Sequence, residues 1–214
     1  MASKIYLIRH GITEGNQKKW FYGAADIPLA EEGREALRRL AEEGAYPAVP
    51  EDADFYTTGL IRTEETFAIL FGEKKHQTIA ELREMRFGEY ECKTWEELKA
   101  YEDFDKWAWD TTGDVGLPGG ETKNQFAARI SGGIERLLGL HRLKELSHRH
   151  SGKDAVSVVV CHGGVISAAM QELFPGERET MWDWMTNPGY GYKIELEDGE
   201  PAGYEKVPVP QEQP

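Results

Sequence analysis

The sequence has few cysteines, no long apolar run and no excess of positive charge. Its two cysteines, Cys92 and Cys161, form no CxxC pair, and in a cytosolic chain two cysteines are most simply free thiols. No apolar run approaches the roughly 20 residues that a membrane span needs. The N-terminal run "IYLI" is too short for the apolar region of a signal peptide. We therefore expect a cytoplasmic protein with no membrane partner, and the cysteines suggest no metal-binding framework.

The charge balance narrows the class of ligand. The chain has 25 basic and 38 acidic residues, which give a formal net charge of -13. Nothing in it resembles a basic stripe, and this argues against nucleic acid as a partner. Any anionic substrate must then be held by a local cationic pocket that works against the field of the whole protein.

The order of apolar patterns predicts an α/β fold. Strands are expected at 4–8, 53–58, 77–82 and 155–160. Helices are expected at 28–44, 60–72, from Thr94 onward, around 126–138 and at 164–174. A loop at 114–121 and a hairpin turning at Asp198 and Gly199 complete the pattern. Because strands alternate with helices, we expect a three-layer sandwich, with a largely parallel central sheet flanked by helices. With no repeat or linker visible, we expect one domain at 1–207 and a frayed tail at 208–214.

Two of the predicted strands stop in the same unusual way. "YLIRHG" ends at His10 and Gly11, and "VVVCHG" ends at His162 and Gly163. Ligands of open α/β sheets bind at the carboxyl ends of the strands, and glycine lets the backbone turn tightly beside a ligand. Either histidine alone could be a structural residue at a strand end, with its hydrogen bonds satisfied by neighbouring groups. The pair together indicates a functional site.

Two arginines are expected at the same edge of the sheet. Arg9 precedes His10, and Arg62 lies in the first turn of the helix that follows the second predicted strand. A guanidinium group offers a planar fork of donors that suits phosphate oxygens and does not lose its charge by titration. Taken alone, Arg62 could be an ordinary surface charge. Two arginines and two histidines at one edge of an acidic protein predict an anion pocket, with phosphate as the expected anion.

These residues resemble a known family. "LIRHGITEGN" is similar to the Arg-His-Gly-x-Thr-x-x-Asn signature of the histidine phosphatase superfamily, the phosphoglycerate mutase-like proteins. Four further segments resemble those of the family, in family order: "GLIRTEET" at 59–66, "LREMRFGEYE" at 82–91, "GGET" at 119–122 and "VVVCHGGVI" at 158–166. The resemblance implies the phosphoglycerate mutase-like fold.

The resemblance also implies a mechanism. His10 would attack phosphorus through a neutral ring nitrogen, and Arg9 and Arg62 would disfavour protonation of that ring. Arg9, Arg62 and His162 would hold the phosphoryl oxygens. The resemblance further assigns the general acid and base to Glu84, while Thr13 and Asn16 would orient the loop or touch the phosphate.

The acidic residue is the least specific assignment. Glu81, Glu89 and Glu91 lie close to Glu84 in the sequence, and each could be an ordinary solvated carboxylate. Glu84 is preferred for its spacing to Gly88.

The sequence departs from the family pattern after the first motif. Trp20 stands where a basic residue is frequent, Ala30 replaces a helix-capping Thr or Ser, and Cys161 replaces a Ser or Thr. Trp20, Phe21, Tyr22 and Gly23 could line a substrate pocket, with the aromatic side chains forming a wall over the leaving group. The aromatic side chains could equally pack their loop onto the domain. The same two interpretations apply to Trp107, Trp109, Trp182 and Trp184.

The pattern favours a phosphomonoester hydrolase for a small phosphorylated metabolite, working without a cofactor or a metal. A cofactor-dependent phosphoglycerate mutase and a non-catalytic phosphate-binding protein remain alternatives, as does a metal-dependent hydrolase. A cysteine-based phosphatase would need arginine six residues after Cys161, where Ser167 stands, and no P-loop motif is present. The sequence does not specify an oligomeric state.

Overall fold

The fold is built on one six-stranded sheet. The structure is a computed structural model, and it describes residues 2–208. The strands are β1 (Ser3–Arg9), β3 (Asp54–Thr57), β4 (Gln77–Thr78), β6 (Ala155–Cys161), β7 (Gly191–Glu197) and β8 (Glu200–Val207), in the spatial order β4-β3-β6-β1-β7-β8. The first four strands of this order are parallel, and the β7–β8 hairpin adds antiparallel strands at one edge. A separate two-stranded sheet pairs β2 (Trp20–Phe21) with β5 (Lys93–Thr94).

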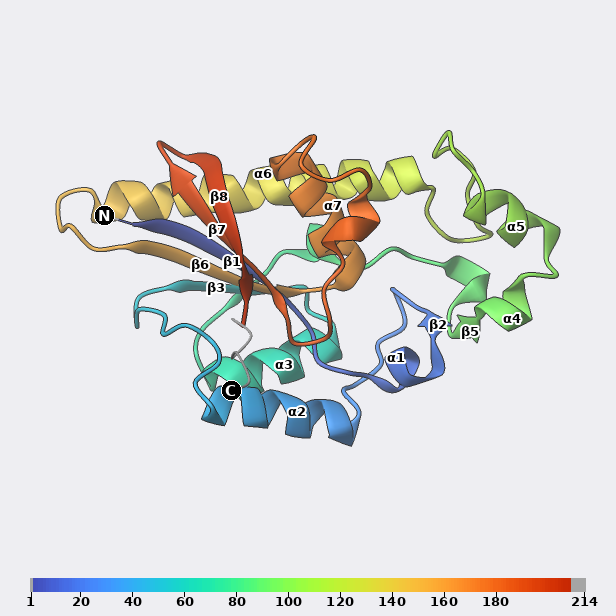
Figure 1. The fold of residues 1–214 in the computed structure, drawn as a ribbon, viewed down its shortest axis with the longest axis horizontal. Helices are drawn as coiled ribbons and strands as arrows, with labels where there is room; N and C mark the ends of the chain where they lie inside the picture. Colours follow the sequence, from blue (N-terminus) through green and yellow to red (C-terminus); the bar gives the residue numbers. More distant parts are fainter. Residues whose placement is uncertain (1, 209–214) are drawn as a thin grey trace.

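Helices cover both faces of the sheet, so the predicted three-layer α/β architecture is confirmed (Figure 1). The α-helices are α1 (Glu14–Lys18), α2 (Glu31–Glu42), α3 (Ile61–Phe71), α4 (Trp95–Leu98), α5 (Glu102–Ala108), α6 (Lys123–His148) and α7 (Gly163–Leu173). Figure 1 shows α6 and α7 on one face and α2 and α3 on the other. Three single-turn 3-10 helices lie at Ala80–Leu82, Gly88–Tyr90 and Met181–Trp184.

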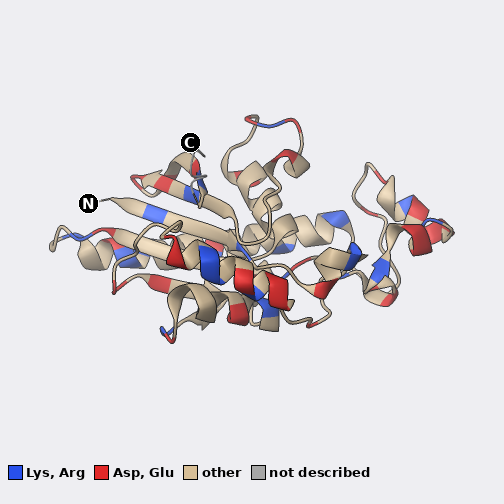
Figure 2. Cartoon of the chain, turned by 60° about the horizontal axis from the view of Figure 1, so that its bottom comes forward, with Lys and Arg blue, Asp and Glu red and all other residues tan. Residues whose placement is uncertain are grey.

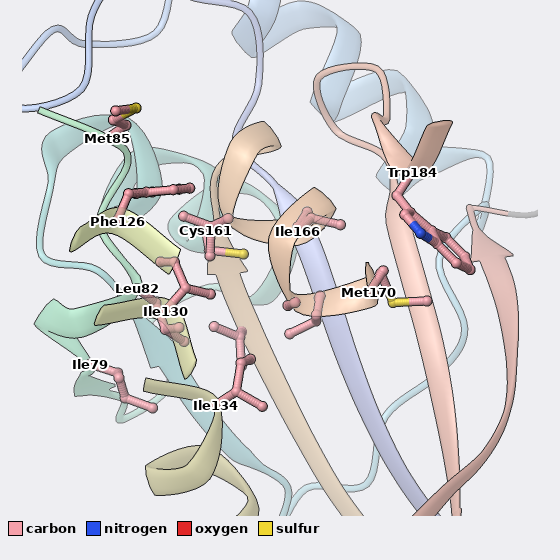
Figure 3. Packing of buried hydrophobic residues seen from close by; sticks show 14 of the residues in the cluster. Ile79, Leu82, Met85, Phe126, Ile130, Ile134, Cys161, Ile166, Met170 and Trp184 are labelled. Carbon is pink, nitrogen blue, oxygen red and sulfur yellow. The ribbon is translucent and has the colours of Figure 1, made fainter. Parts of the chain in front are cut away.

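Alternation along β1 divides the core between the two faces of the sheet. Ile5 and Leu7 belong to the larger apolar cluster, and Tyr6 and Ile8 to the smaller one, as expected when successive side chains of a strand point to opposite faces. The larger cluster fills the space between the sheet and α6 and α7 (Figure 3). All seven residues of β6 are buried, and this explains why every residue of the strand except Ser157 is apolar.

Short-range chemistry accounts for several element boundaries. Thr94, where the sequence predicts the start of a helix, caps α4 through a capping box with Glu97. Ala30 is the N-cap of α2 and provides no side-chain hydrogen bond. Asp198 and Gly199, with φ of 52° and 87°, form the two-residue turn of the predicted hairpin.

The strand predicted at 77–82 is wrong beyond its first two residues. The chain pairs with β3 only at β4 and then turns into the 3-10 helix Ala80–Leu82. Ile79 and Leu82 are both fully buried in the larger cluster, and a 3-10 turn brings side chains three residues apart onto one side. The expected α2 also begins later, at Glu31, because Leu29 instead forms a bridge with Thr13.

Two further features concern the surface and the ends of the described chain. None of the helices in residues 2–208 is both long enough and apolar enough to cross a membrane. Figure 2 shows Lys and Arg interspersed with Asp and Glu over the helices. The tail expected at 208–214 lies outside the described residues, except for Pro208.

Candidate active site

The structure brings His10 and His162 together at the carboxyl edge of the sheet. Arg9 and Cys161 are register partners in the adjacent parallel strands β1 and β6, so the residues that follow them are neighbours. The two imidazole rings meet nearly edge to face, with centroids 5.3 Å apart. Both side chains are buried, at 3% and 0% exposure.

The ring of His10 is held in one tautomer. Its Nδ1–H donates to the carbonyl oxygen of Gly11 across 2.7 Å, because a carbonyl can only accept. The lone pair of the neutral ring is therefore on Nε2. Burial lowers the pKa of His10 well below its ordinary value, and the positive charges of Arg62 and Arg9 lower it further. His10 thus offers a neutral nucleophilic nitrogen.

His162 is neutral for the same reasons and is held at both ring nitrogens. Its Nδ1 accepts a hydrogen bond from Nε of Arg62 at 3.3 Å, so its Nε2–H donates to the hydroxyl of Thr58 at 2.9 Å. Burial is the main cause that lowers the pKa of His162, followed by Arg62, His10 and Arg9. Thr58 follows β3 at the same edge of the sheet, but no motif in the sequence marks it as a residue of the site.

Arg62 is a fully buried guanidinium group. It lies in the first turn of α3 and donates to the carbonyl oxygens of Ala25 and Gly23, both at 2.8 Å. Its guanidinium carbon lies 5.0 Å from the centre of the Tyr22 ring, a cation–π distance. Within residues 2–208 it forms no ion pair with a carboxylate.

Arg9 is the second cation of the site. Its Nη1 donates to the carbonyl oxygen of Thr186 and lies 3.7 Å from the sulfur of Met185. Its Nε is buried and has no hydrogen-bond partner in the described part of the chain, where Arg9 also forms no ion pair. Buried donors are normally satisfied, so the two guanidinium groups together indicate a site for an anion.

Glu84 reaches the same edge from the chain segment after the 3-10 helix Ala80–Leu82. Its Oε2 accepts from the backbone N–H of Gly164, at the start of α7, across 2.9 Å, and its Oε1 accepts from its neighbour Met85 at 3.0 Å. Its carboxylate is also the main group that counteracts the effect of burial on the pKa of Arg9. Glu84 is therefore close to both the helix terminus and the cationic pocket.

The other acidic candidates have different surroundings. Glu81 forms an ion pair with Arg136 at 2.9 Å. Glu91 accepts hydrogen bonds from the backbone N–H groups of Gly23, Ala24, Ala25 and Phe87, at 2.8 to 3.1 Å. Glu91 thus shapes the loop whose carbonyls hold Arg62. Glu89 is exposed. The geometry therefore favours Glu84 as the acidic group of the site.

Thr13 and Asn16 shape the loop after β1. They form the capping box of α1, in which Oδ1 of Asn16 accepts from both the backbone N–H and the hydroxyl of Thr13. The Thr13 hydroxyl also lies 2.6 Å from the phenol oxygen of Tyr22. Since Oδ1 of Asn16 is used in the cap, its amide NH2 is the group it could offer to a ligand.

The aromatic residues at 20–22 separate into different environments. Phe21 packs against the rings of Phe87, Phe104 and Trp107, with centroids 5.2 to 6.3 Å apart, which fits the loop-packing interpretation. Trp20 lies under the ammonium group of Lys18. Of the three, only Tyr22 contacts the charged groups of the site. Gly23 follows it, where a Cβ would lie 1.7 Å from the carbonyl oxygen of Met85.

The four tryptophans at 107, 109, 182 and 184 also differ from one another. Trp107 and Trp184 are buried in the larger apolar cluster, whereas Trp109 and Trp182 are 70% and 63% exposed. Met185, which follows the 3-10 helix of Trp182 and Trp184, contacts Arg9. No sequence motif signals that contact.

The described side chains form no cluster of the kind that binds a metal ion. In residues 2–208, no three His, Cys, Asp or Glu side chains are grouped so that they could hold a metal ion.

Comparison with known proteins identifies the family. The family model described as histidine phosphatase superfamily (branch 1) matches residues 5–204. The chain belongs to this superfamily.

Its relatives include both phosphatases and mutase-like proteins. The chain is 28% identical over 199 residues to the adenosylcobalamin/alpha-ribazole phosphatase of Escherichia coli K12, with 90% of each chain covered. It is 27% identical over 186 residues to phosphoglycerate mutase-like protein 4 of Arabidopsis thaliana, covering 83% of this chain and 74% of that protein.

Solved structures place the same fold in both groups. The alpha-ribazole phosphatase from Shigella flexneri superposes with a TM-score of 0.74 at 24% identity, covering 96% of each chain. A phosphoglycerate mutase from Thermus thermophilus superposes with a TM-score of 0.62 at 25% identity, covering 94% of this chain and 97% of that chain. The phosphoglycerate mutase-like fold expected from the sequence is confirmed.

Proposed function

We propose that this chain is a phosphomonoester hydrolase that acts on a small phosphorylated metabolite through a phosphohistidine at His10. One observation carries the proposal. Two guanidinium groups, the fully buried Arg62 and the half-buried Arg9, have no carboxylate partner in residues 2–208 and flank a neutral histidine whose Nε2 carries a lone pair. A phosphate dianion would supply the missing negative charge.

The first step transfers the phosphoryl group to the enzyme. Nε2 of His10 attacks phosphorus in line, a P–N bond forms, and the P–O bond to the leaving group breaks. The carboxyl group of Glu84 gives its proton to the departing oxygen. Arg9 and Arg62 stabilise the charge on the phosphoryl oxygens, and His162 lies beside them in the same pocket.

The second step releases phosphate. The carboxylate of Glu84 takes a proton from a water molecule as the water oxygen attacks phosphorus. The P–N bond breaks, His10 recovers its lone pair, and inorganic phosphate leaves with Glu84 protonated again.

Labelling tests the proposal directly. Brief incubation with a radiolabelled aryl phosphate should give a base-stable, acid-labile label on His10, and His10→Ala should abolish both the label and turnover. A His10→Ala variant with normal activity would contradict the mechanism. Phosphate binding without any label would favour the non-catalytic alternative.

A second assay separates hydrolase from mutase. Sugar, nucleotide, glycerate and alpha-ribazole phosphates are tested for phosphate release, beside a mutase assay primed with 2,3-bisphosphoglycerate. We expect phosphate release to dominate. Transfer of phosphate between glycerate positions that exceeded phosphate release would favour the mutase. This alternative is tested because the chain is also similar to phosphoglycerate mutase-like proteins.

A further inference from the structure

The proposed acid, Glu84, lies in a segment with little regular structure of its own. Between the 3-10 helices Ala80–Leu82 and Gly88–Tyr90, residues 83–87 belong to no helix or strand. The position of its carboxyl group therefore depends on whatever holds that backbone in place.

Arg129, in the second turn of α6, holds the segment by its carbonyl groups. Its Nη1 donates to the carbonyl oxygens of Glu81 and Arg83, at 2.6 and 2.8 Å, and its Nη2 donates to that of Glu84 at 3.3 Å. One planar guanidinium group thus contacts three carbonyls within four residues. A lysine could not reproduce this, because its ammonium group is a single point charge rather than a rigid fork.

Glu121 fixes Arg129 from the other side. Its carboxylate accepts from Nε and Nη2 of Arg129, both at 2.8 Å, and also from the backbone N–H of Arg86 at 2.9 Å. Its own backbone N–H donates to the carbonyl oxygen of Arg86. Glu121 is only 3% exposed. Burial alone would raise the pKa of its carboxyl group, but Arg129 and the Arg86 N–H lower it, so the group stays ionised.

We propose that Arg129 and Glu121 are positioning residues, which fix the backbone at residues 81–86 so that the carboxyl group of Glu84 points at the phosphoryl site. This inference rests on the proposed function. Neither residue contacts the substrate. They act through Glu84, and a misplacement of that group by about 1 Å can cost about a hundredfold in rate.

The leaving group of the substrate separates positioning from folding. An alkyl phosphate such as glycerol 2-phosphate needs a proton from Glu84 as its P–O bond breaks, whereas p-nitrophenyl phosphate leaves readily without one. In Arg129→Met we expect kcat/KM to fall about a hundredfold for glycerol 2-phosphate and less than about tenfold for p-nitrophenyl phosphate. A general structural defect would lower both values by the same factor, and that outcome would overturn the inference.

A double-mutant cycle identifies the residue through which Arg129 acts. Once Glu84→Gln has removed the acid, adding Arg129→Met should lower kcat/KM for glycerol 2-phosphate by less than about threefold. If the losses of the two single variants multiply instead, Arg129 acts by another route, such as its charge near His162, and the inference fails.

Arg136 provides a matched control. It lies two turns further along α6 and binds the same segment, but only through the exposed side chain of Glu81. Arg136→Met should leave kcat/KM for both substrates unchanged within about twofold. A loss in Arg136→Met as selective as that in Arg129→Met would overturn the inference.

Milder variants keep the test decisive if Arg129→Met does not fold. Arg129→Lys and Glu121→Gln retain much of the local shape, and each should show a selective loss for the alkyl substrate smaller than that of Glu84→Gln. Equal losses on both substrates would count against positioning. An inactive parent enzyme, or an active His10→Ala variant, would contradict the proposed function instead.

Discussion

The imidazole rings of His10 and His162 lie 5.3 Å apart although 151 residues separate them in the chain. Their strands, β1 and β6, are adjacent and parallel, and both rings are buried beside Arg62. Two like-charged imidazolium ions could not be accommodated there at low cost. The arrangement therefore stabilises both rings in the neutral form, which is the form a nucleophilic histidine needs.

Acidification should destabilise the protein in a pH range set by its buried histidines. Burial is the main cause that lowers the pKa of His10, His162 and His141 in the folded chain. In the unfolded chain these groups take up protons below about pH 6.5, so the unfolded state then binds more protons and stability decreases as the pH is lowered. Each group contributes up to about 1.4 kcal/mol per pH unit.

Urea unfolding at pH 7.5, 6.0 and 5.0 measures this effect. Carboxyl groups whose folded pKa is lowered act mainly below this range, so the loss between pH 6.5 and 5 reports the histidines. His141→Gln should make that loss shallower, because His141 lies in a buried cluster with Ser3 and Ser157, remote from the site. A free energy of unfolding that stayed constant from pH 7.5 to 5.0 would contradict the prediction.

Inorganic phosphate or vanadate should stabilise the protein through Arg62. An anion that binds only the folded state adds about 1.4 kcal/mol when its concentration is ten times its Kd. In Arg62→Met, the melting temperature should no longer rise with phosphate, because the variant lacks the buried guanidinium group that would bind the anion. Arg136→Met, which removes an exposed cation, serves as the control and should keep the full shift. A phosphate-dependent shift of normal size in Arg62→Met would place the anion elsewhere.

The sequence was most informative where burial leaves a simple pattern. The runs at 4–8 and 155–160 are apolar apart from Lys4 and Ser157, because β1 and β6 lie in the middle of the sheet, covered on both faces. From this pattern, two parallel strands that each end at a His-Gly pair are predicted, and the carboxyl ends of parallel strands lie at one edge of the sheet. This suffices to predict that His10 and His162 share that edge.

Positions fixed by long-range contacts could not be predicted from the sequence in the same way. The strand expected at 77–82 turned into a 3-10 helix because the buried space beside α6 accepts Ile79 and Leu82 together. The contact between Thr58 and His162 depends on the order of strands in the sheet. The hydrogen bonds from Arg129 to the backbone around Glu84 depend on how α6 packs. No residue spacing in the sequence predicts them.

A single methyl group at Gly164 should reduce activity without unfolding the protein. A Cβ there would lie 2.5 Å from Oε1 of Glu84 and must displace that carboxyl group, so we expect kcat/KM for an alkyl phosphate to fall about a hundredfold. Alanine favours a helix over glycine by up to about 1 kcal/mol, and this gain offsets part of the cost of the new contact. We therefore expect the free energy of unfolding to decrease by no more than about 1 kcal/mol. Gly132→Ala in α6, where a Cβ meets nothing within 4 Å, should keep full activity. Parental kcat/KM in Gly164→Ala would show that Glu84 need not occupy its observed position.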